Sequence, residues 1–169
     1  MIIKNAKVFM DGPGHFENLD IRVVGSKIAE VAEKIEVGSE EVIDAKNCFV
    51  TPGIIEAHSH IGMYEEGIQW EGDDICENEP VTPEMRSIDA IFPGDIAFND
   101  ALTGGVTTMC TGFGSGGVVA GTAAIVENNG SLIADEIVIV PDAGMKCAFG
   151  ENPRDFGRKG KQPNTRASV

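Results

Sequence analysis

Alternating hydrophobic and polar positions predict short β-strands at the start of the chain. In the stretch LDIRVV, Ile21 and Val23 alternate with charged residues, which is the period-two pattern of a half-buried strand. The Gly25-Ser26 pair that follows is typical of a hairpin turn. Other short apolar runs are separated by turn sequences such as DGPG. Residues 1–52 are therefore predicted to form a small all-β unit.

Longer units replace these short strands from residue 53 onward. Apolar runs such as GIIEAHSHIG, VTTMCTGFG and DEIVIVPDAG are rich in β-branched residues and end in glycine-containing turns. Between the first two runs, PGDIAFNDALTGG is predicted to be a helix closed by glycines at its C-terminus. Strands that alternate with helices are typical of α/β proteins with parallel sheets, so residues 53–169 are predicted to belong to the α/β class.

A polar segment of about 30 residues interrupts this second region. It runs from MYEEG to DAIF and contains three acidic clusters and Trp70, the only tryptophan in the chain. Loops of that length in compact domains are generally functional or disordered. The last stretch, from ENPRDFG onward, is also polar and has few apolar residues to anchor it.

Charge and composition narrow the classes of partner. The chain has 169 residues, 27 of them acidic and 13 basic, for a formal net charge of -14. A field of that sign repels phosphate backbones and anionic membrane surfaces, so neither nucleic acid nor a membrane is expected as a partner. No apolar stretch approaches the ~18 residues of a membrane span. The four cysteines show no close pair, which favours reduced thiols and a cytoplasmic protein.

Two of the three histidines, His58 and His60, lie in PGIIEAHSHIG at the end of a predicted strand. Residues i and i+2 of a strand share a face and are separated by about 6 to 7 Å, so two such imidazoles can bind one ion. Catalytic zinc normally uses three protein ligands, so the pair is an incomplete set. Such a pair can also be incidental or satisfied by hydrogen bonds. Its position at the end of the first strand of a βα series favours metal ligation, because barrel folds assemble active sites there.

These motifs and their order resemble those of the amidohydrolase superfamily and, within it, of the branch related to imidazolonepropionase. The leader that ends in EVIDAKNCFVTPGIIEAHSH is similar to that family's passage from a small β-sandwich, through Pro-Gly, into a (β/α)8 barrel. ALTGGVTTM resembles the helix that leads into the second barrel strand. NEPVTPEMRSIDAIFPGD and GMKCAFGENPRDFG resemble segments of uncharacterised bacterial members of this branch.

This resemblance implies both a fold and an activity. Residues 1–52 correspond to the N-terminal part of a composite β-sandwich, and residues 53–169 to the first βα units of a TIM-like barrel that is incomplete here. His58 and His60 correspond to two ligands of a divalent metal, with zinc as the expected ion. Water activated by that metal would hydrolyse a C–N bond in a small-molecule amide or cyclic amide. The matches assign no further catalytic residue.

The family's remaining ligands come from later strands, which we do not find in this sequence. Lys146 and Glu127 are two alternatives for a bridging ligand, because a buried lysine can lose its proton and a carboxylate can bridge; each could equally be an ordinary surface or ion-pairing residue. The number of metals, one or two, is left open. His15 lies in the turn DGPGHF and is expected to be exposed. The chain also has Glu56 where the family often has aspartate.

The length of the second region leaves two hypotheses. A complete barrel needs about 250 residues, so residues 53–169 hold fewer than half of its strands. In the first hypothesis, the chain is the N-terminal fragment of a metal-dependent hydrolase and is inactive alone. In the second, it is a truncated, non-catalytic binding or assembly module. Such a module would need a partner, either further copies in a homo-oligomer or a complementing chain, because open strand edges invite pairing.

Overall fold

The chain forms two compact units in a computed structural model, Met1–Pro52 and Gly53–Val169. The structure describes residues 1–10, 14–64, 66, 72, 74, 79–154, 160 and 163–169. Trp70 and Cys76 lie outside these described residues. Within the described ranges, none of the helices has the length and apolar character that crossing a membrane would require.

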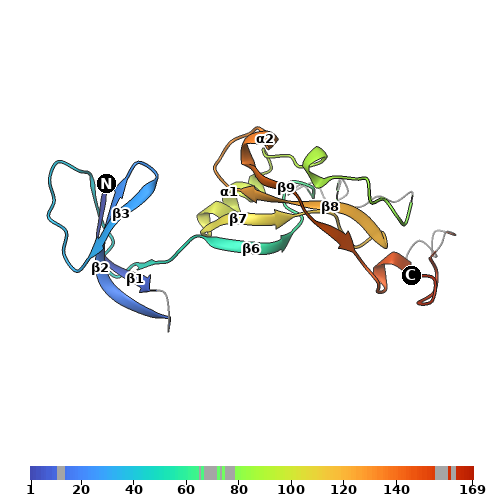
Figure 1. The fold of residues 1–169 in the computed structure, drawn as a ribbon, viewed down its shortest axis with the longest axis horizontal. Coiled ribbons are helices and arrows are strands. Elements are labelled where there is room, and N and C mark those ends of the chain that lie inside the picture. Colours follow the sequence, from blue (N-terminus) through green and yellow to red (C-terminus); the bar gives the residue numbers. More distant parts are fainter. Residues whose placement is uncertain are drawn as a thin grey trace. The chain divides into compact units, whose positions relative to one another are not determined.

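The first unit is a five-stranded β-sheet (Figure 1). Its strands are β1 (Ile2–Met10), β2 (His15–Val24), β3 (Lys27–Ala32), β4 (Val42–Asp44) and β5 (Phe49–Val50). β1 pairs antiparallel with β2 and parallel with β4 and β5, while β3 extends the sheet beyond β2. Gly25, in the turn between β2 and β3, has a φ of 59°, which glycine adopts without strain. The predicted all-β character and this hairpin are confirmed.

The buried positions of this sheet are mainly apolar, and Asp20 is the charged exception. Only 3% of Asp20 is exposed. Its Oδ2 accepts hydrogen bonds from Lys4 Nζ at 2.6 Å and from the Ile35 N–H at 2.9 Å. Its Oδ1 accepts one from the Asn5 N–H at 2.9 Å. Burial by itself raises the pKa of Asp20, but these bonds and the charge of Lys4 outweigh it and hold the pKa below its ordinary value of 3.8.

The second unit contains a four-stranded sheet in the order β6-β7-β8-β9 (Figure 1). The strands are β6 (Ile54–Ser59), β7 (Val106–Thr111), β8 (Val119–Glu127) and β9 (Val138–Cys147). The helical elements are η1 (Ser87–Asp89), α1 (Ile96–Thr103), α2 (Ala134–Ile137) and η2 (Asn152–Arg154). The hydrophobic core of this unit includes Met63, Phe98, Met109, Phe113 and Val126.

The passage from β6 through α1 to β7 is a βα unit with parallel strands. α1 begins after Asp95, whose side chain accepts a hydrogen bond from the Ala97 N–H at 3.0 Å. It ends at Gly104, and Gly105 then has a φ of 86°, a value that favours glycine. The predicted helix closed by glycines is confirmed. The parallel pairing places the end of β6 beside the end of β7.

The strands after β7 correct the expectation of a parallel sheet throughout. β8 pairs antiparallel with β7, and β9 pairs antiparallel with β8. The connecting segments, residues 112–118 and 128–137, are shorter than the dozen or more residues that a parallel crossover needs, so each strand reverses direction. DEIVIVPDAG begins as the short helix α2 and only then continues as β9. The sheet of the second unit is therefore mixed.

Candidate metal site at the end of β6

His58 and His60 lie together at the end of β6. Their rings meet edge to face, with centroids 5.2 Å apart and planes at 81°. Between them, the Ser59 hydroxyl donates a hydrogen bond to the Cys110 carbonyl oxygen at 3.1 Å. This bond ties the end of β6 to β7, so the two imidazoles are held on a supported strand end.

The ring of His60 is oriented by groups that follow in the chain. Its Nδ1 lies 2.6 Å from the Gly112 carbonyl oxygen. Because a carbonyl oxygen only accepts, the neutral ring of His60 carries its proton on Nδ1 and keeps a free lone pair on Nε2. The carboxylate of Asp74 lies near the same nitrogen, with Oδ2 3.9 Å from Nδ1, and 9% of Asp74 is exposed. Metal-binding histidines usually have this arrangement, with one nitrogen held by a carbonyl or carboxylate and the other available.

The surroundings of His58 disfavour its protonated form. The positive charge of Lys146 is the main cause that lowers the pKa of His58 below its ordinary value of 6.5. Burial acts in the same direction, as does any positive charge on His60, and the charge of Glu56 opposes them. The Glu56 side chain also accepts a hydrogen bond from the backbone N–H of His58 at 2.9 Å. Neutral imidazole is the form that binds metals, so the electrostatics around His58 favour ligation.

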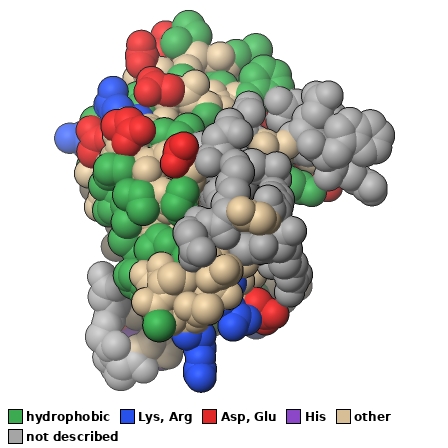
Figure 2. Space-filling model, turned by 90° about the vertical axis from the view of Figure 1, so that its right-hand side faces the viewer, with side chains coloured by type: hydrophobic (Ala, Val, Ile, Leu, Met, Phe, Trp, Pro, Cys, Tyr) green, Lys and Arg blue, Asp and Glu red, His purple; other side chains and the backbone are tan. Residues whose placement is uncertain are grey.

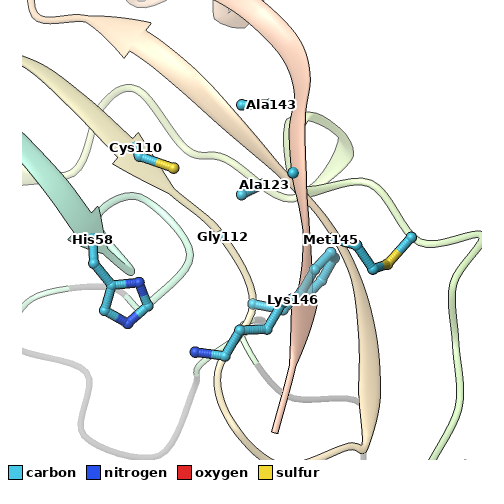
Figure 3. A pocket seen from close by; sticks show the side chains of 9 residues that line it. His58, Cys110, Gly112, Ala123, Ala143, Met145 and Lys146 are labelled. Carbon is cyan, nitrogen blue, oxygen red and sulfur yellow. The ribbon is translucent and has the colours of Figure 1, made fainter.

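A cavity of about 210 Å³ opens beside His58 (Figure 3). Its lining combines apolar residues, among them Phe113 and Met145, with Cys110 from β7 and Lys146 from β9. Figure 3 shows the side chains of His58 and Lys146 reaching toward each other from their two strands. One basic group and one imidazole therefore face a mostly apolar hollow.

The structure separates the two alternatives for a further ligand. Lys146 is partly buried and lines the cavity beside His58. Glu127 is exposed and pairs with Thr108, near the start of β7, whereas Ser59 pairs with Thr111 at its end. Glu127 therefore lies at the opposite end of the sheet from the histidines.

His15 is an exposed residue of the first unit. Its Nε2 lies 2.7 Å from Glu17 Oε1, and about half of each side chain is exposed, at 51% and 48%. The expected exposure of His15 is confirmed, but its expected place in a turn is corrected, because His15 is the first residue of β2 and pairs with Met10 of β1.

Two imidazoles are the metal donors that the end of β6 supplies. In the parts of the chain that the structure describes, no group of three or more His, Cys, Asp or Glu side chains is placed to hold a metal ion. The neutral His58 and the free Nε2 of His60 fit two positions of a zinc-like site. Sequence reasoning missed Asp74 and the Gly112 carbonyl, because nothing distinguished Asp74 from the other acids of its polar segment.

Comparisons with known proteins decide the family. Models of known protein families give no match to this chain. The solved structure of an amidohydrolase from Thermotoga maritima aligns with 99% of the chain, with a TM-score of 0.89 and 36% sequence identity. The chain belongs to the amidohydrolase superfamily.

Sequence relatives of this amidohydrolase chain agree with that assignment. Amidohydrolase tasK of Hapsidospora irregularis is 31% identical over 163 residues, and a dihydroorotase of Streptococcus thermophilus is 35% identical over 157 residues. The alignments cover 87% and 92% of this chain but only 17% and 32% of the two relatives, and the Thermotoga structure is covered to 44%. The chain thus spans less than half the length of these proteins. The superfamily prediction is confirmed, whereas the branch related to imidazolonepropionase stays a prediction.

Proposed function

We propose that this amidohydrolase chain supplies the metal-binding strand end of an enzyme that hydrolyses a C–N bond in a small amide or cyclic amide. The observation that carries the proposal is the pair formed by His58 and His60. The two rings lie together, one neutral and the other with a free Nε2, beside a cavity. The names of the relatives, amidohydrolase and dihydroorotase, support the same class of reaction.

His58 and His60 are the residues that would hold a divalent ion, for which we propose zinc. Imidazole nitrogen is a preferred zinc ligand, and the pair would fill two of the usual three protein positions. When bound, such an ion supplies activated water at neutral pH and polarises a carbonyl group. The chain prepares both ligands in advance, because the Gly112 carbonyl fixes the tautomer of His60 and the charge of Lys146 disfavours protonation of His58.

The apolar wall beside His58 would receive part of the substrate. Phe113 is 1% exposed and lines this wall together with Ala123 and Met145. Such a wall excludes water from the reacting amide and strengthens the polar interactions around it. The volume of about 210 Å³ is below the ~300–1,000 Å³ typical of ligand pockets, so this chain would contribute only a part of the pocket.

Hydrolysis of N-acyl amino acids and cyclic amides tests the proposed activity. We expect zinc-loaded protein expressed from the complete reading frame that contains this chain to hydrolyse at least one substrate of such a panel. The chain of 169 residues alone should stay at background, because a barrel active site is assembled from the loops of about eight strands. Activity that is absent from the complete protein, or that survives in its His58→Ala variant, would contradict the proposal.

Lys146 is the residue that we propose for a further ligand position, in preference to Glu127. A lysine ligates as the neutral amine, so the ammonium that acts on His58 in the metal-free chain would have to give up its proton when the ion binds. Lys146→Met is then expected to weaken zinc binding by about tenfold or more, as measured by calorimetric titration. Glu127→Gln is the matched control and should change the affinity by less than about twofold. Tighter binding by Lys146→Met would contradict this role, because removing a charged ammonium relieves repulsion of the ion.

The hypothesis of a binding or assembly module has an observation of its own. β6 and β9 form the two edges of the second sheet, and Ile55 on β6 and Ile139 on β9 are 72% and 54% exposed. Hydrophobic side chains are also exposed on the face drawn in Figure 2. Because exposed apolar edge strands pair with other strands, further copies of the chain or a complementing chain would cover them. A monomer of 17.9 kDa in light scattering would argue against self-association.

A further inference from the structure

A polar cavity of about 330 Å³ lies on the sheet of the first unit. Its lining residues are Asn5, Lys7, Asn18, Lys46 and Asn47. Every one of these side chains carries N–H donors, in three amides and two ammonium groups. The described lining contains no carboxylate, although the chain has 27 acidic and only 13 basic residues. The cavity is therefore a locally basic hollow in an acidic protein.

The pairing of the strands determines the position of Lys7, one of the two cations that line this cavity. Lys7 on β1 lies opposite Asn18 on β2 and opposite Phe49 on β5, so these three residues share one face of the sheet. Lys7 Nζ lies 5.0 Å from the centroid of the Phe49 ring, within the range of a cation–π interaction. The Phe49 ring, which does not line the cavity, thus helps to position the Lys7 ammonium.

Two of the lining residues have an uncommon backbone conformation. Asn5 and Asn47 have φ angles of 61° and 68°, and no other non-glycine residue in the described ranges has a positive φ. Asparagine tolerates this conformation better than most residues, but it is still sparsely populated, and such conformations gather at binding sites. Both asparagines line the same cavity.

Asp44 supports the rim of the cavity without lining it. Its Oδ1 accepts hydrogen bonds from Asn5 Nδ2 at 2.9 Å and from the Lys46 N–H at 3.2 Å. These bonds, led by that from Asn5, lower the pKa of Asp44 below 3.8. The Asp44 charge offsets the charge of one of the two lining lysines, so Lys7, Lys46 and Asp44 together carry one positive charge.

We propose that this cavity binds a small oxyanion, either a carboxylate or a phosphate group. Ammonium and amide N–H donors arranged around a hollow match the acceptor oxygens of such an anion, and bonds between charged groups are the stronger ones. Among the described residues, the side chains of Asn18 and Asn47 make no hydrogen bond, so their donors are available. The proposal is independent of the metal site.

Nuclear magnetic resonance titrations of the chain with sodium phosphate and with sodium acetate, at constant ionic strength, test this site. We expect saturable shifts of the asparagine side-chain NH2 signals with at least one anion, with a dissociation constant of about 1 mM or tighter. If only one of the two anions gives saturable shifts, that anion shows whether the site prefers a phosphate or a carboxylate group. Lys46→Gln, which keeps the backbone N–H bonded to Asp44, should weaken binding at least about fivefold.

Lys34→Gln is the matched control for this site. Lys34 is exposed on the same unit, and its Nζ pairs with Glu36 at 3.0 Å. Its replacement should leave anion binding unchanged, whereas Lys7→Gln should weaken it as Lys46→Gln does. Shifts that stay linear with both anions would overturn the proposal. An equal weakening by Lys34→Gln would also overturn it, because general electrostatic attraction would then explain the shifts.

Discussion

Replacing both His58 and His60 with alanine will lower the affinity of the chain for zinc at least about 100-fold. The two imidazoles are the donors that the end of β6 provides, and the described residues offer no group of three donors that could replace them. The affinity is measured by competition against a chromophoric chelator at neutral pH. Circular dichroism of the double variant should match that of the unmodified chain, because neither ring belongs to a hydrophobic core cluster.

His15→Ala provides the matched control for this experiment. It also removes one imidazole, but from an exposed position beside Glu17 in the first unit. Its zinc affinity should stay within about twofold of the original, because His15 belongs to the other unit and is not a member of the imidazole pair. Undiminished zinc binding by the double variant would contradict the proposed metal site. An equal loss of zinc affinity in His15→Ala would also contradict it.

The second large effect concerns the buried carboxylate of the first unit. Asp20→Asn will lower the free energy of unfolding of this unit by about 3 kcal/mol, because breaking a buried ion pair leaves its partner uncompensated. That partner is Lys4, whose side chain is 19% exposed. An amide in place of the carboxylate would also turn one NH2 group toward the N–H donors of Asn5 or Ile35. Urea unfolding, followed through the amide signals of β1 and β2, measures the change.

The pH dependence of this stability has a defined sign. The pKa of Asp20 is lower in the folded chain than its ordinary value of 3.8, so the carboxylate stabilises the fold fully above that value. The contribution is lost as the pH falls through the lowered pKa, and Asp20→Asn should lack this loss. Asp44→Asn is the control: Asp44 is exposed, and its replacement should cost less stability than that of Asp20. A variant Asp20→Asn with the stability and pH profile of the unmodified chain would contradict the role of this network.

Local patterns in the sequence predict the elements of this fold better than their pairing. The alternation around Ile21 and Val23 and the following Gly25 predict the hairpin of β2 and β3, because these signals act over neighbouring residues. The glycines at 104 and 105 predict the end of α1 for the same reason. The reversal of β8 and β9 was not predicted, because strand direction depends on connection length and on pairing between distant residues.

The candidate site, too, could be predicted only in its local features. The spacing of His58 and His60 predicts that the imidazoles share a strand face, and their rings do lie together. The Gly112 carbonyl that orients His60 lies 52 residues further along the chain, and no local pattern indicates it. The approach of Asp74 to His60 likewise depends on tertiary structure. The sequence could therefore indicate the ligands but not the groups that hold them in place.

X-ray absorption at the zinc edge of the zinc-loaded chain tests the metal site most directly. We expect imidazole scattering from two histidines, with zinc–nitrogen distances of about 2.0–2.1 Å, that disappears in the double variant of His58 and His60. A zinc spectrum without imidazole scattering, or one that is identical in the double variant, would contradict the account.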